Sequence, residues 1–366
     1  MTLKTLLLGS ATAFAVVGGA QAADLSVAEP VDYVRVCDAF GTGYWYIPGT
    51  DTCLAIHGLV QFDANFHDSK NLWAGSPSHS ATWDFVTEAH INFTAKSMTE
   101  FGELTSFAEF RAQSNNANWK GGGTGSYLAY LDSAYLSLGA LLAGRTGSVY
   151  DYGGGYNWDY SDYDSDAGAD QVRLSWAMSG FGVALGIEDP RDRWGTTLGA
   201  SYSLPNIVGA ITASQANWSG QVSAGFAETS FGSGFGVQAA ISIKLDSIAA
   251  GDALRLKGAW AESQVSSFAS SSAPVYAGGS VWSALASFQH FWTPQLSSAV
   301  TFDYQNVGAG TIQPAFSQWE AAANLVWSPV AGFMAGVEAG YIDPPSIAAP
   351  GTNGTWNGKV RLVRSF

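Results

Sequence analysis

The chain has 366 residues, of which 47% are hydrophobic and 13% are charged, and its formal net charge at pH 7 is −14. A typical soluble domain has about 25% charged residues, so this composition argues against an ordinary soluble fold. The negative charge argues against nucleic acid as a partner and permits a modest preference for cations.

Residues 1–22 have the features of a secretory signal peptide. Lys4 gives a positive start, an apolar stretch runs from Leu6 to Val17, and Ala20-Gln21-Ala22 is a small-x-small cleavage site. Cleavage after Ala22 would start the mature chain at residue 23. The alternative is a retained membrane helix, but the apolar stretch is shorter than the ~20 residues that a span needs.

Residues 23–53 are predicted to form a leader followed by a segment closed by a disulfide. Residues 23–36 show no regular alternation, and the only two cysteines, Cys37 and Cys53, follow them. Because an exported chain enters an oxidising compartment, we expect the two cysteines to pair. Two free thiols are the alternative, and the spacing is far from the C-x-x-C of a redox-active pair.

From residue 54 to residue 366 the chain alternates between apolar and polar residues, as β-strands with one apolar and one polar face do. The pattern predicts strands at 54–66, 82–96, 103–113, 128–137, 140–147, 170–178, 181–188, 196–203, 208–216, 220–228, 235–244, 254–263, 281–289, 296–305, 317–327, 333–342 and 356–366. A closed bacterial barrel has an even number of strands, so one of these ranges must be wrong. We predict an all-β fold, a transmembrane antiparallel β-barrel of 16 strands over 54–366, with the stretch 205–280 the hardest to divide.

The lengths of the connections and the positions of aromatic residues indicate how such a barrel would be oriented in a membrane. Short turns are predicted at 179–180, 205–207 and 328–330, and long polar connections at 67–81, 114–127, 147–169, 264–280, 306–316 and 343–355. Outer-membrane barrels show this asymmetry, although a soluble β-sandwich can show it too. In 317–327 the apolar face has Trp319 and Trp327 at its ends and Leu325 between them. Because aromatic girdles flank the lipid band of such barrels, the apolar face is predicted to contact lipid and the polar face water.

The segment 147–170 is the strongest functional signal. It has no Lys or Arg, and its acidic residues are Asp151, Asp159, Asp162, Asp164, Asp166 and Asp170. If this loop folds into the barrel, it would narrow a pore. Its carboxylates would then face basic residues of the polar wall across a transverse field. A solvated external loop is one alternative, and a loop that binds Ca²⁺ is another. The segment is not an EF-hand, because Ala167 occupies the glycine position and Arg173 the place of the final Glu.

Basic residues that share a face with polar neighbours are candidates for the opposing wall. The predicted basic wall consists of Arg111, Arg145, Arg173, Lys359 and Arg361. Strand parity adds Arg255 and Lys257 as candidates, with Lys96 as a further one.

The motifs of known catalytic sites are absent from the sequence. It has no G-x-S-x-G, phosphate-binding glycine loop or H-E-x-x-H, and its five histidines lack metal-ligand spacing. We therefore expect no enzyme, no cofactor and no metal centre.

Several segments together resemble the trimeric general porins of alphaproteobacterial outer membranes. The resemblance covers essentially the whole mature chain. Its marks are EPVDYVRVCD at 29–38, YIPGTDTCL at 46–54, HG at 57–58, AGRT at 143–146, ANLVWSP at 323–329 and RLVRSF at 361–366.

The resemblance implies a 16-stranded homotrimeric barrel in the Gram-negative outer membrane, through which small hydrophilic solutes and ions diffuse passively. It also implies that the loop after the fifth strand folds inward, and that the barrel-assembly machinery reads the C-terminal Phe366. One departure is Gln61, where such porins often carry Arg, so that fewer basic residues would shift selectivity toward cations. A substrate-selective channel and a non-conducting structural or adhesin barrel are the alternative functions.

Overall fold

The computed structural model describes residues 35–67, 83–114, 128–158, 163–194, 204–348 and 352–366. Residues 37–366 belong to one compact unit. The predicted signal peptide and nearly all of the predicted leader lie outside the described residues. No helix among the described residues is long and apolar enough to cross a membrane.

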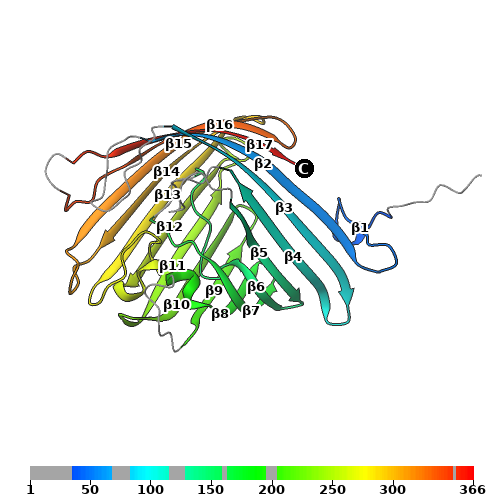
Figure 1. Cartoon of the computed structure of the whole chain (residues 1–366), viewed down its shortest axis with the longest axis horizontal. Coiled ribbons are helices and arrows are strands. Elements are labelled where there is room, and N and C mark those ends of the chain that lie inside the picture. The colour runs from blue at the N-terminus through cyan, green and yellow to red at the C-terminus, as the bar shows by residue number, and fades with distance from the viewer. Residues whose placement is uncertain (1–34, 68–82, 115–127, 159–162, 195–203, 349–351) are drawn as a thin grey trace, which may run out of the picture. The chain divides into compact units, whose positions relative to one another are not determined.

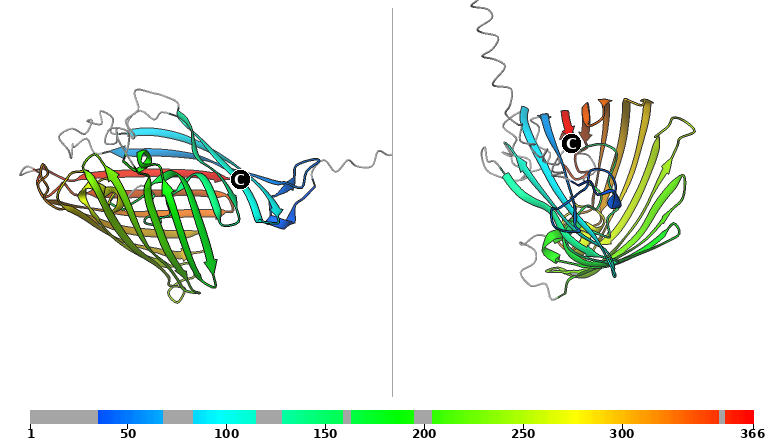
Figure 2. Two further views of the ribbon diagram at one scale, coloured as in Figure 1. Left: turned by 90° about the horizontal axis from the view of Figure 1, so that it is seen from below. Right: turned by 90° about the vertical axis from the view of Figure 1, so that its right-hand side faces the viewer.

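Sixteen antiparallel strands form a closed barrel, in which each strand pairs with the next and β17 pairs with β2 (Figure 1). Figure 2 shows them running side by side at a tilt. The predicted number of strands is confirmed. Their bounds are β2 (Cys53–His67), β3 (Trp83–Thr99), β4 (Gly102–Gln113), β5 (Leu128–Leu138), β6 (Leu141–Gly147), β7 (Gly168–Met178), β8 (Phe181–Glu188), β9 (Asn206–Ser214), β10 (Trp218–Thr229), β11 (Gly232–Lys244), β12 (Ala253–Glu262), β13 (Ser280–Thr293), β14 (Leu296–Val307), β15 (Phe316–Val330), β16 (Phe333–Ile342) and β17 (Thr355–Ser365).

Among the described residues, four shorter elements lie outside these strands. The two-residue β1 (Trp45–Tyr46) pairs with the start of β2, and η1 (Asp38–Phe40) precedes it. The connection between β8 and β9 contains α2 (Pro190–Trp194), and the connection between β12 and β13 contains η2 (Ser263–Phe268).

The extra strand among the seventeen predicted ranges, 196–203, lies outside the described residues. Its neighbours β8 and β9 pair directly with each other, from Phe181 with Ala213 to Glu188 with Asn206. The predicted turn at 205–207 was wrong, because Asn206 already begins β9. Pro205 therefore stands directly before a strand, a position that proline tolerates because no ladder hydrogen bond is needed there.

The two faces of the wall differ as the alternation predicts. On β7, Val172 and Trp176 are 46% and 49% exposed, whereas Gln171, which precedes Val172 and points to the opposite face, is 5% exposed. Exposed apolar residues recur in this way along the other strands. Large apolar surfaces of this kind are suited to lipid rather than to water.

Aromatic side chains form a band on the outward face of neighbouring strands. Ring contacts join Phe302 to Trp319, Trp319 to Tyr341, and Tyr341 to Trp356, with centroids 5.8, 5.3 and 5.0 Å apart. Trp327 lies on the same face of β15 and is 51% exposed. The predicted placement of Trp319 and Trp327 on the apolar face is therefore confirmed.

Cys37 and the C-terminal Phe366 are both tied to the first long strand of the barrel, β2. Cys37 and Cys53 form a disulfide, as predicted, with Cα atoms 6.0 Å apart, and Cys53 is the first residue of β2. At the seam, the amide of Phe366 donates to the carbonyl of Gly58, and the amide of Gly58 donates to Phe366 in return, at 2.9 and 3.0 Å. A Cβ on Gly58 would lie 2.7 Å from the Phe366 ring, so glycine permits this close approach.

Candidate functional site

In the connection between β6 and β7, the described residues 148–158 and 163–167 lie against the inner face of the wall. The Tyr152 hydroxyl donates to Ser242 Oγ of β11 at 3.1 Å. The Tyr156 amide donates to Ser287 Oγ of β13 at 2.9 Å. These contacts use the polar face of the strands, so this first limb of the loop runs inside the barrel.

The tip of the first limb reaches the last strands. The Trp158 amide donates to Glu338 Oε2 of β16 at 2.8 Å. The guanidinium of Arg361, on β17, lies 5.0 Å from the centre of the Trp158 ring. Arg361 also donates to both oxygens of Asp63 on β2, at 2.8 and 2.7 Å. The loop therefore reaches the seam between the last and first strands.

The returning limb is bound by a buried ion pair. Lys257 Nζ of β12 donates to Asp164 Oδ2 at 2.9 Å and to the Ser165 carbonyl at 3.0 Å. The two charged side chains are only 2% and 3% exposed. The Tyr163 amide donates to Asp303 Oδ2 of β14 at 3.1 Å. Burial raises the pKa of the Asp164 carboxyl to about 6, more than the ammonium of Lys257 lowers it.

The base of the loop is held through the backbone of Tyr150, a fully buried residue. Its carbonyl accepts hydrogen bonds from Ser223 Oγ at 2.6 Å, Gln238 Nε2 at 2.9 Å and Gln221 Nε2 at 3.0 Å. Its hydroxyl donates to the Phe268 carbonyl at 2.8 Å, and burial raises its pKa. Both ends of the loop are thus fastened to the wall.

The acidic residues predicted to line a constriction have different environments. Asp151 and Asp164 are mostly buried and paired with Arg193 and Lys257, so they hold the loop rather than face a solute. Asp166 is exposed. Asp159 and Asp162 lie outside the described residues. Because a Ca²⁺ site on this loop would use Asp162, that alternative stays a prediction.

Two predicted constriction residues, Arg145 and Asp170, lie on the outward face of the barrel, so this part of the prediction was wrong. They are register partners on β6 and β7, and their parity is that of the exposed Leu141 and Val172. Arg145 Nη1 contacts Asp170 Oδ2 at 3.3 Å and Asp192 Oδ1 at 2.7 Å. Cross-strand pairing between opposite charges accounts for this pair without any role in a pore.

The other predicted basic residues do face inward, but with carboxylates beside them. Arg111 contacts Glu109 at 2.8 Å and Asp132 at 3.0 Å. Lys359 Nζ lies 3.4 Å from Asp63, the partner of Arg361. The inward ion pairs on β2–β5 and β17 include five carboxylates and four Lys or Arg side chains: Asp63, Glu88, Glu103, Glu109 and Asp132, and Lys96, Arg111, Lys359 and Arg361. The wall that carries the predicted basic residues therefore has mixed charge.

Arg173 faces inward on β7, where its Cβ lies 3.3 Å from the position that a Cβ on Gly186 would occupy. Parity also correctly placed Arg255 and Lys257 inward, although it did not predict that both bind the loop. Arg255 donates to the Gly154 carbonyl and lies 4.7 Å from the Tyr156 ring.

Several residues that bind the loop were not singled out from the sequence. Glu338 could have been identified from the sequence as an inward polar residue, because it is a lone acid between apolar neighbours on β16. Nothing in the sequence pointed to Arg193, because it lies in a five-residue helix that follows the loop and the strands β7 and β8. Among the described residues, no group of three or more His, Cys, Asp or Glu side chains could hold a metal ion.

A closed barrel that is apolar outside and polar inside, with a loop bound to its inner wall, defines a transmembrane β-barrel of the porin type. Residues 24–359 match the family model described as Porin subfamily. The chain belongs to this family.

Related sequences agree with this family. The chain is 48% identical over 160 residues to "Putative outer membrane protein y4fJ" of Sinorhizobium fredii, which covers 42% of this chain and 45% of the relative. It is 36% identical over 228 residues to Porin Omp2b of Brucella canis, which covers 58% of this chain and 62% of the relative. The chain thus spans about half to three fifths of the length of these curated relatives.

Solved structures share the fold. The outer membrane channel DcaP of Acinetobacter baumannii superposes with a TM-score of 0.70 at 14% identity, over 88% of this chain and 99% of that one. OmpF of Salmonella typhi superposes with a TM-score of 0.61 at 13% identity, over 86% and 98%. At these identities the likeness concerns the fold alone.

Proposed function

We propose that this chain is a general diffusion porin, a passive water-filled channel for small hydrophilic solutes and ions across the Gram-negative outer membrane. The observation that carries the proposal is the polar loop 148–167, bound along the inner face of a barrel whose outer face is apolar. A loop in that position narrows the interior without filling it with an apolar core, which is what a size-limited aqueous channel requires. The family and the relative named Porin Omp2b support the same function.

The constriction lies between the loop and the inward charges of β2–β5 and β17. Because those charges are paired, the field of each pair decays over a short distance, and a passing solute meets alternating donors and acceptors rather than one strong field. Among the described residues, the carboxylates in these pairs outnumber the Lys and Arg side chains, and the whole chain has a formal net charge of −14. A mild preference for cations follows.

The partners follow from the fold and the family. The apolar outer face takes outer-membrane lipid, and a homotrimer is the assembly that trimeric porins of similar fold support. Recognition of Phe366 by the barrel-assembly machinery and cleavage of residues 1–22 as a signal peptide belong to the same proposal.

Planar-bilayer recording of the purified protein tests the function directly. We expect a conductance that rises in proportion to salt concentration. In a KCl gradient, the sign of the reversal potential should show that K⁺ permeates more readily than Cl⁻. Block by one solute at low concentration would instead indicate a substrate-selective channel, and a barrel that does not conduct would refute the proposal.

A matched pair of variants tests the place of the constriction. Asp132→Asn removes a carboxylate on the inward face, where the side chain is 28% exposed and bound to Arg111. Asp170→Asn removes the same charge from the outward face, where it is 62% exposed. We expect Asp132→Asn alone to reduce cation preference. Equal shifts from both variants would refute the assignment of the lumen wall.

A further inference from the structure

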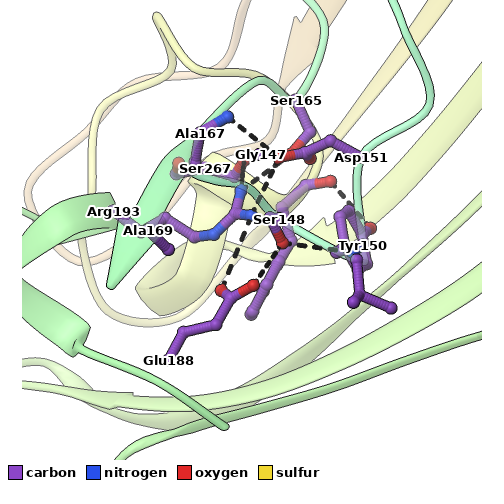
Figure 3. A network of polar contacts seen from close by, with 12 residues as sticks. Gly147, Ser148, Tyr150, Asp151, Ser165, Ala167, Ala169, Glu188, Arg193 and Ser267 are labelled. Atoms are coloured by element: carbon purple, nitrogen blue, oxygen red, sulfur yellow. Dashed lines mark hydrogen bonds and ion pairs between the residues drawn. The ribbon is translucent and has the colours of Figure 1, made fainter. Parts of the chain in front are cut away.

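Arg193 belongs to α2, in the connection between β8 and β9, but its side chain reaches into the base of the loop 148–167. The side chain is 1% exposed. Its Nη2 contacts Asp151 Oδ2 at 3.1 Å, and its Nη1 donates to Ser165 Oγ at 2.8 Å (Figure 3). Asp151 lies near the start of the loop and Ser165 near its end, and Ser165 Oγ donates to Asp151 Oδ1. One guanidinium therefore joins both limbs of the loop.

The same guanidinium contacts a third connection, between β12 and β13. Its Nη1 donates to the Ser267 carbonyl at 3.4 Å. Its Cζ lies 4.8 Å from the centre of the Phe268 ring and 5.5 Å from that of Tyr150. These two rings pack against each other with centroids 4.7 Å apart. A planar cation with several donors suits this place, because it stacks on rings and donates in two directions at once.

The charge of Arg193 is balanced by two buried acids. Besides Asp151, Glu188 at the end of β8 has its Oε2 4.0 Å from Arg193 Nη2, and its side chain is fully buried. Glu188 also accepts a hydrogen bond from Ser148 Oγ, at the start of the loop. Removal of the guanidinium would leave both carboxylates buried without their counter-ion, which strongly favours a rearrangement that lets water in.

The helix that carries Arg193 is itself anchored to the rim of the wall. Asp192 accepts from Arg145 Nη1 at 2.7 Å and from the Asp170 amide at 2.8 Å. Trp194 Nε1 donates to Asn206 Oδ1 of β9 at 3.1 Å. The Arg145 side chain and the Asp170 backbone amide thus hold the helix from which Arg193 extends inward, whereas the Asp170 carboxylate contacts Arg145.

We propose that Arg193 is the positioning residue that fixes the base of the inserted loop and so sets the width and steadiness of the channel. This inference rests on the proposed function, since it names the residue that controls the constriction. Arg193 acts through Asp151 and Ser165, and its own contacts described above are all with the loop base, Glu188 and the β12–β13 connection. Loss of this clamp frees both limbs at the point where they leave the wall.

The test compares Arg193→Gln and Arg193→Lys with the control Arg191→Gln. Arg191 lies on the same helix, is 64% exposed and pairs with Asp189. A heat-dependent shift on SDS gels first shows that each barrel folds. In single-channel recordings we expect Arg193→Gln to increase transitions to other conductance levels several-fold and to close at lower voltage. Arg193→Lys keeps the charge but loses the planar guanidinium with its several donors, so its rate of transitions should lie between those of Arg193→Gln and the native protein. Arg191→Gln should match the native protein.

Hydrogen exchange of residues 148–158 in the same variants separates this inference from the proposed function. If the native protein does not conduct, the proposed function fails, whereas faster exchange in Arg193→Gln than in Arg191→Gln still supports the clamp. If the native protein conducts and Arg193→Gln matches Arg191→Gln in conductance, noise and exchange, the clamp is refuted. Should Arg193→Gln not fold, Ser165→Ala decides, because it removes the hydrogen bonds of Ser165 Oγ with Arg193 and Asp151 but no charge. Unchanged noise and exchange in that variant would refute the inference.

Discussion

The ion pair between Lys257 and Asp164 offers a quantitative test of how the inserted loop is bound. Lys257→Met keeps most of the apolar stem but removes the ammonium, which donates to Asp164 Oδ2 at 2.9 Å and to the Ser165 carbonyl at 3.0 Å. Both side chains are almost fully buried, at 2% and 3% exposure. Removal of one partner from such a pair costs about 3–5 kcal/mol. The equilibrium between bound and detached loop should therefore shift by about two to three and a half orders of magnitude.

The readout is hydrogen exchange at two backbone amides that depend on the returning limb. The Tyr163 amide donates to Asp303 Oδ2 at 3.1 Å, and the Ser271 amide donates to the Asp164 carbonyl at 2.8 Å. Both should lose protection in Lys257→Met. The control is Lys244→Met, at the end of β11, which removes the same group from an exposed site.

A double variant separates charge from packing. With Asp164→Leu added to Lys257→Met, no uncompensated charge remains, and apolar replacement of a buried pair is often close to neutral. We expect exchange to return most of the way to the native rate. The reasoning would be refuted if the exchange rate in Lys257→Met stayed within about threefold of the rate in the Lys244→Met control. A threefold change corresponds to less than about 1 kcal/mol. A double variant as labile as the single one would show that charge is not the cause.

Three further predictions concern pH, the disulfide and the seam. The pKa of Asp164 is raised from 3.8 to about 6 by burial, so docking of the loop is most stable below about pH 4 and loses about 3 kcal/mol as pH rises through 6. Hydrogen exchange at the loop amides, corrected for its intrinsic pH dependence, should become faster over this pH range. The Asp164→Asn variant should not show this change. Replacement of Cys37 and Cys53 by Ser opens a loop with a sequence separation of 16 and should lower the unfolding free energy in denaturant by about 3 kcal/mol. An unchanged midpoint would contradict this. Asp63→Asn leaves Arg361 without its bidentate partner and should shift the reversal potential toward anions. A shift toward cations would count against this pairing in the lumen.

The sequence by itself determined which residues form the wall and which face each presents. Alternation with a period of two is a property of neighbouring residues, so it placed Trp319 and Trp327 outward and Arg111 and Arg361 inward without any knowledge of strand pairing. The pairing of Cys37 with Cys53 was also predictable, because export to an oxidising compartment and two cysteines leave one intramolecular choice.

Local patterns were least informative at strand ends and in connections. The turn predicted at 205–207 was wrong because short apolar runs near Gly and Pro suit a strand end and a turn almost equally well. Arg145 was placed in the lumen as a member of the basic wall and Asp170 as part of the acidic segment, although the register of β6 and β7 puts both on the outward face.

Only the tertiary structure decided which charges meet. Lys257 and Asp164 are 93 residues apart in the chain, and Arg193 and Asp151 are 42 apart. No local pattern joins such positions, because the partner of an inward side chain depends on strand register and on the path of the inserted loop across the barrel. The acidic loop was therefore recognisable from the sequence. The structure showed that two of its carboxylates, Asp151 and Asp164, are used to hold it in place.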